Sequence, residues 1–150
     1  MVEKNSKPKK AADSGWSDAE KAAMKERAKE LKEEKATKSR SADEQVVLGK
    51  IAEMAEHDRK IAEKIYQIVK EEFPSLYPKT WYGMPAFQLD GKVLVFFQSA
   101  QRFGTRYNTL GFSDSAKLDE GSFWPSSYAL VELTAEVEDR IRELIRKAIG

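Results

Sequence analysis

The stretch from Tyr77 to Gln98 constrains the fold of this chain most strongly. Two runs rich in aromatic and branched residues flank the pair Asp90 and Gly91. An Asp-Gly pair between apolar runs is among the strongest local signals for a β-hairpin, because both residues tolerate the positive φ of a type I′ turn. The second run, Val93 to Phe97, is continuously apolar, which is typical of a central strand. The stretch therefore predicts an antiparallel sheet.

Further strands are expected on both sides of this hairpin. The predicted strands cover residues 80–88, 92–99, 104–112 and 128–131. Pro85 has no N–H to donate to a ladder, so the first strand is expected to lie at an edge of the sheet or to carry a bulge there. A short helical turn is expected between residues 113 and 120, and residues 123–127 are expected to form a loop.

Apolar residues at helical spacing predict the helices of the domain. Two helices are expected between residues 44 and 73, with a break near His57 and Asp58 as the N-cap of the second. Thr134 is expected to cap a closing helix. Helices before and after an antiparallel meander indicate a two-layer α+β fold, with the sheet packed by N-terminal helices and a C-terminal helix.

The beginning of the chain differs in composition from the rest. Residues 1–16 are predicted to be a disordered tail, because they offer almost nothing to bury. Ser17 and Glu20 form a capping-box pattern, so residues 17–43 are predicted to be a charged helical arm with too few apolar residues to dock firmly. A second capping box, from Ser41 to Glu44, is expected to open the α+β domain at residues 44–150.

Composition excludes several functions. The 26 basic and 25 acidic residues nearly cancel, so we expect no nucleic-acid partner, and the sequence contains no apolar run long enough for a membrane span. The chain has no cysteine, one histidine, no Gly-rich phosphate loop and no His-Glu-x-x-His motif. We therefore expect a soluble, cytoplasmic protein that is not an enzyme. His57 is expected to be an exposed residue near a helix cap, without a catalytic or metal-binding role.

Four segments of the chain resemble the YdhG-like family, bacterial domains of unknown function. The resemblance covers about residues 44–149, and it is carried by the segments Lys79–Phe87, Lys92–Ser99, Arg106–Phe112 and Leu133–Glu136. It implies a small α+β domain whose antiparallel sheet is packed by helices. One branch of the family is described as a frataxin-like intracellular iron chaperone, Fra, so the resemblance also implies iron as a possible cargo.

Aromatic and polar residues near the sheet form the first candidate site. Apolar surfaces with a few placed polar groups are typical of binding sites, and Tyr and Trp often anchor protein interfaces. The candidate ligand-binding or partner-binding residues are Trp81, Tyr82, Met84, Gln98, Arg106, Tyr107 and Trp124. The alternative is that these aromatic residues belong to the core, with arginines stacked on them at the surface.

Surface carboxylates form the second candidate site, for iron. Carboxylate oxygen suits iron, and an open acidic ridge would let a chaperone release its metal. The first candidates are Glu53, Glu56 and Asp58, followed by Asp114, Asp119, Glu120, Glu132, Glu136 and Asp139. The alternative is ordinary pairing on helix surfaces, since Glu136 and Glu138 precede Arg140 and Arg142 by four residues.

Overall fold

The computed structural model describes residues 15–36 and 40–150. The predicted disordered tail, residues 1–16, lies outside the described residues except for its last two. In the described part, the elements follow in the order α2 (Asp18–Ala36), α3 (Arg40–Ala52), α4 (Glu56–Glu72), β1 (Tyr77–Trp81), β2 (Met84–Leu89), β3 (Lys92–Gln98), α5 (Ala100–Phe103), β4 (Asn108–Phe112), β5 (Ser127–Leu130) and α6 (Ala135–Ile149).

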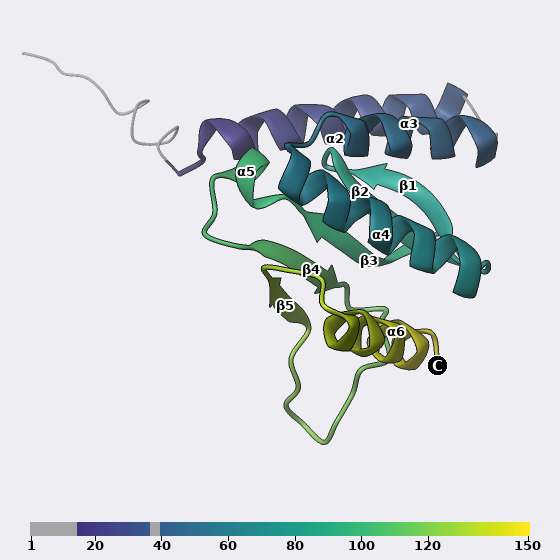
Figure 1. Ribbon diagram of the computed structural model, residues 1–150. Helices are drawn as coiled ribbons and strands as arrows, with labels where there is room; N and C mark the ends of the chain where they lie inside the picture. Colours follow the sequence, from purple (N-terminus) through teal and green to yellow (C-terminus); the bar gives the residue numbers. More distant parts are fainter. Residues whose placement is uncertain (1–14, 37–39) are drawn as a thin grey trace, which may run out of the picture.

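The strands form one antiparallel sheet in the order β1-β2-β3-β4-β5. Helices α4 and α6 cover one face, whereas α2 and α3 lie side by side near β1 (Figure 1). This arrangement is the predicted two-layer α+β fold, with the apolar run of β3 at the centre of the sheet.

Two tight turns, rather than one, organise the first three strands. The predicted turn at Asp90 and Gly91 is confirmed, since both residues have positive φ, 52° and 82°. Tyr82 and Gly83 form a second turn of the same kind, with φ of 55° and 75°. The single strand predicted at residues 80–88 is therefore wrong, because the chain reverses within it and forms β1 and β2.

Three further expectations about the sheet region need correction. Strand β2 is not an edge strand, because β1 and β3 flank it; its pairing with β3 starts just after Pro85, and the bulge lies between Phe87 and Gln88. The strand predicted from residue 104 starts only at Asn108, after the short helix α5. Residues 113–120 form no helix; their backbone makes bends and turns.

The face of the sheet toward α4 and α6 carries the core. Phe87, Val95 and Phe97 are nearly inaccessible to solvent, and the ring of Phe87 lies 6.2 Å from that of Tyr66 on α4. Burial of side chains this large stabilises the fold by about 1.5–3 kcal/mol each. Side chains alternate along a strand, so Trp81, Met84, Phe96 and Gln98 lie on the opposite face, which we call the aromatic face.

The break between α3 and α4 near His57 is confirmed, but the predicted caps there are not. Ser41 is already the second residue of α3, and the carboxylate of Glu44 accepts a hydrogen bond from the hydroxyl of Tyr66 on α4. Ala55 is the N-cap of α4, and Asp58 is its third residue. Both acidic side chains therefore bind distant partners instead of their own helix ends.

The terminal helices behave differently from each other. Thr134 caps α6 as predicted, accepting from the amide of Val137 at 3.2 Å. The capping box of Ser17 and Glu20 is also present on α2, with reciprocal bonds of 2.9 and 3.0 Å. Although α2 has few apolar residues, it contacts β1 and α5, and Glu30 on α2 is buried. The predicted domain boundary near residue 43 stays a prediction.

Candidate functional site

Part of the predicted aromatic site assembles at the turn between β1 and β2. The rings of Trp81 and Tyr82 meet edge to face at 4.9 Å, and Trp81 lies 5.2 Å from Phe96. Met84 is paired with Trp81 across the ladder and is buried. Gln98 lies further along β3 on the same aromatic face. Trp81 and Phe96 are half-buried, so their positions are compatible both with a binding surface and with a place in the core.

The other three predicted residues of this site lie away from the turn between β1 and β2. Arg106 stacks on Tyr107 at 5.1 Å, just before β4. Trp124 is half-buried in the loop before β5 and packs against the core. The structure has three cavities, described below, that none of the seven predicted residues lines. The arginine of this set therefore has the stacked position that the core alternative expects.

The three leading iron candidates do not share a site. Glu56 pairs with Lys60 at 3.1 Å, and Glu53 lies 3.9 Å from Lys50. Asp58 is buried and accepts from the Ser99 hydroxyl and the Gln101 amide. Across residues 15–36 and 40–150, no three His, Cys, Asp or Glu side chains gather in a way that could hold a metal ion. The described residues thus offer iron no ligand set.

A small pocket between α6 and β5 has a different character, and we call it the α6–β5 pocket. Its volume is about 180 Å³. Residues spaced three and four apart share one face of a helix, and α6 presents such a row to this pocket. The lining residues are Leu118, Glu120 and Pro125 from the β4–β5 loop, Tyr128 from β5, and Arg140, Glu143, Leu144 and Lys147 from α6.

Backbone and side-chain contacts hold the loop of this pocket against α6. The amide of Lys117 donates to the carbonyl of Ala148 at 2.9 Å, and Lys147 donates to Glu120 at 2.6 Å. The ring of Tyr128 is held edge to face, 6.1 Å from Phe112. The wall of the pocket is therefore formed by three segments that are fixed relative to one another.

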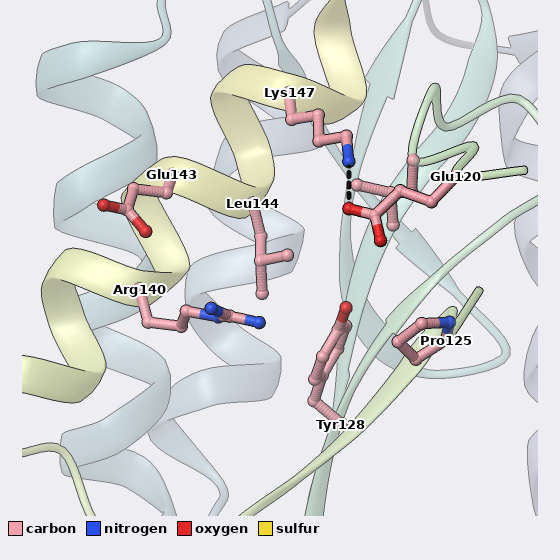
Figure 2. A pocket seen from close by; sticks show the side chains of 8 residues that line it. Glu120, Pro125, Tyr128, Arg140, Glu143, Leu144 and Lys147 are labelled. Atoms are coloured by element: carbon pink, nitrogen blue, oxygen red, sulfur yellow. Dashed lines mark hydrogen bonds and ion pairs between the residues drawn. The ribbon is translucent and has the colours of Figure 1, made fainter.

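Some charged side chains of the α6–β5 pocket are paired with each other, and others are not. The hydrogen bond and the charge of Lys147 hold the pKa of the Glu120 carboxyl below its ordinary value, and the charge of Arg140 adds to this effect. The side chain of Arg140 makes no hydrogen bond or ion pair with any residue that the structure describes, and the hydroxyl of Tyr128 makes no hydrogen bond there either. Figure 2 shows both groups pointing toward the space between α6 and β5, with the Leu144 side chain reaching from α6 into the same space.

This arrangement can bind a small anion with an apolar body. A guanidinium offers donors in a planar fork that matches a carboxylate, and Tyr128 adds a neutral donor. Leu118, Leu144 and Pro125 supply apolar surface. Sequence reasoning missed this pocket because it paired Arg140 with Glu136; that pairing is wrong, whereas the parallel pair of Arg142 with Glu138 is present at 3.7 Å.

A wider cavity of about 400 Å³ lies beside the start of β1. Its polar groups mostly bind one another: the hydroxyl of Tyr77 donates to Asp43 at 2.6 Å, Lys79 pairs with the same oxygen at 3.4 Å, and Arg40 stacks on the Tyr77 ring. Burial, as the largest cause, and the hydrogen bond to Asp43 together raise the pKa of Tyr77 to about 12. A third cavity nearby, beneath Tyr66, has a volume of only about 10 Å³.

The histidine His57 makes a contact between two elements. His57 is exposed, and its ring nitrogen Nε2 donates to the carbonyl of Val131 at 2.8 Å, which ties the start of α4 to the end of β5.

Among the described helices, none combines the length and the apolar composition that a membrane span requires. Comparison with protein families, curated proteins and solved structures finds no match for this chain. The resemblance to the YdhG-like family therefore stays a prediction.

Proposed function

We propose that this chain is a non-catalytic, cytoplasmic binding domain that takes a small carboxylate in the α6–β5 pocket. The observation that carries the proposal is the pair of unused donors, the Arg140 guanidinium and the Tyr128 hydroxyl, beside the apolar side chain of Leu144. The charges of Glu120 and Glu143, which also line the pocket, oppose a dianion such as phosphate more strongly than a monoanion. The volume suits a body of a few carbon atoms, since pockets for drug-sized ligands span about 300–1,000 Å³.

Amide NMR with butyrate as the probe tests this proposal. We expect shifts confined to Tyr128 and to the face of α6 that carries Arg140, with much smaller shifts from inorganic phosphate. A charge-assisted hydrogen bond contributes about 1.5–3 kcal/mol, so Arg140→Gln should weaken butyrate binding about tenfold or more. Tyr128→Phe keeps the ring against Phe112 and removes one neutral donor, so it should have a smaller effect.

The matched control is Arg106→Gln. It removes the same charge from an exposed position that stacks on Tyr107 and does not line the pocket. Butyrate affinity should be unchanged in this variant. Equal affinity of Arg140→Gln and Arg106→Gln, or butyrate shifts spread over the whole surface, would contradict the proposal.

The aromatic face is a second candidate for binding, favoured by the contact between the half-buried rings of Trp81 and Phe96 beside Gln98. A partner that docks there should shift the indole signal of Trp81 and leave that of Trp124 unchanged. A peptide and metabolite screen by NMR distinguishes the two signals. The α6–β5 pocket is preferred because its donors lack partners within the described chain, whereas the rings on the aromatic face already pack on each other.

Iron binding through surface carboxylates is the remaining alternative, and the described residues support it least. An anaerobic titration with ferrous iron addresses it directly. Broadening confined to amides near Glu53, Glu56 and Asp58 at micromolar metal would favour the chaperone function. A spectrum that does not change would leave the carboxylate-binding proposal as the better account.

A further inference from the structure

The turn between β1 and β2 binds a carboxylate from the distant helix α2. Tyr82 and Gly83 both have positive φ, so their two N–H groups can point to the same side. The amide of Tyr82 donates to Oε1 of Glu30 at 2.9 Å, and the amide of Gly83 donates to Oε2 at 2.9 Å. Glu30 is only 4 % exposed. The turn thus holds both oxygens of one anion by main-chain donors.

Two arginines complete this site. Arg102 of α5 donates to the carbonyl of Gly83 at 2.6 Å and fixes the turn from the other side. A side chain at Gly83 would collide with this guanidinium, since an added Cβ would lie 2.4 Å from Nη2. Arg27, one helical turn before Glu30, pairs with it at 3.4 Å and lies 5.9 Å above the Tyr82 ring. The turn therefore contacts an Arg and a Glu three residues apart on one helix.

The large apolar side chains of α2 are only partly covered. Met24 and Leu31, its large apolar residues, are 39 % and 46 % exposed. Ala23 is buried, and Glu26 pairs with Lys50 of α3 at 3.2 Å. A short polar pattern therefore forms the buried contact between α2 and the turn, and a helix from another chain that carries this pattern could make the same contacts.

We propose that the Tyr82–Gly83 turn is a recognition site for helices with an Arg-x-x-Glu pattern, and that α2 is its built-in occupant. The Glu accepts the two turn amides and the Arg lies over the Tyr82 ring, as Glu30 and Arg27 do within the chain. The partner is a helical segment of another protein chain that carries this Arg-x-x-Glu pattern and competes with α2 for the turn. This site is separate from the α6–β5 pocket and does not rest on the proposed function.

Hydrogen exchange of single amides in the full chain tests the inference. In the unmodified chain, the amides of Tyr82 and Gly83 should exchange slowly. Glu30→Ala should speed their exchange about tenfold or more, because two bonds to a buried carboxylate are lost. A synthetic peptide of residues 17–36, added to the Glu30→Ala chain, should restore slow exchange. The same peptide with Glu30→Gln should not, and with Arg27→Gln it should bind more weakly.

Controls separate recognition from general loosening of α2. Glu26→Ala removes the pair with Lys50 and should leave the turn amides slow. Unchanged chemical shifts at Phe97 and Leu110 report that the core of each variant is intact. Exchange at Tyr82 and Gly83 that does not respond to Glu30→Ala would overturn the inference. Restoration by the Gln peptide as complete as by the Glu peptide would overturn it as well.

Discussion

Replacing Asp58 by Ala should destabilise the fold far more than an ordinary helix substitution. Asp58 is 5 % exposed and accepts from the Ser99 hydroxyl at 2.6 Å and from the Gln101 amide at 3.1 Å. Ser99, 2 % exposed, in turn accepts from the Arg102 amide and caps α5. Hydrogen bonds to a charged group contribute about 1.5–3 kcal/mol each. Taking the lower value for two bonds, we expect a loss of about 3 kcal/mol.

Urea unfolding followed by circular dichroism measures this loss, and thermal unfolding should show Tm lower by about 6–12 °C, since 1 kcal/mol shifts Tm by about 2–4 °C at this size. The matched control is Glu56→Ala, an acidic residue of the same first turn that makes an exposed pair with Lys60. It should lose far less stability than Asp58→Ala, because solvent screens an exposed ion pair.

A double-mutant cycle isolates the bond to Ser99. In a Ser99→Ala background, Asp58→Ala should cost at least about 1 kcal/mol less than in the natural chain, because the shared hydrogen bond is already absent. The reasoning is refuted if Asp58→Ala costs no more than Glu56→Ala, or if the effects of Asp58→Ala and Ser99→Ala simply add.

Three other variants test the sheet and its cavities. Gly111→Ala would place a Cβ 2.2 Å from the ring of Phe96, so we expect a loss of about 1–3 kcal/mol in urea unfolding that largely disappears in a Phe96→Ala background. Phe97→Ala empties a fully buried position of the core and should cost about 3–5 kcal/mol by thermal unfolding. The pKa of Tyr77 is raised to about 12 by burial and by the bond to Asp43, whereas an unfolded tyrosine has a pKa of about 10. Its contribution to stability is therefore complete below about pH 10 and is lost as pH rises through the folded pKa. A tyrosinate absorbance titration checks this, because Tyr77→Phe should remove a phenol that titrates late.

The sequence predicted the parts of the fold that depend on local chemistry. The Asp90–Gly91 turn follows from the positive φ that these two residues tolerate, and the caps at Ser17 and Thr134 follow from hydroxyls placed before helical runs. The stripe of apolar residues on α6 also placed this helix correctly on the core. Each of these features is decided by residues within a few positions of one another.

Features that depend on distant partners were not predictable in this way. The Tyr82–Gly83 turn places a tyrosine at positive φ, and the carboxylate of Glu30, 52 residues before Tyr82, accepts from both amides of the turn. Asp58 has the composition of an N-cap, yet it bonds Ser99 in the sheet layer. The same limit hid the α6–β5 pocket, because Arg140 had a suitable neighbour in the sequence and only the fold directs it toward Tyr128.

The order of the strands has a consequence for how the chain acquires its fold. Each strand pairs with its neighbour in the sequence, so the sheet needs no crossover connection. Short loops close at little entropic cost, so we expect the meander to form early, starting at the two tight turns. Pulse-labelling hydrogen exchange should find amides of β2 and β3 protected before those of α6. During synthesis, the last helix would then close over a sheet that is already complete.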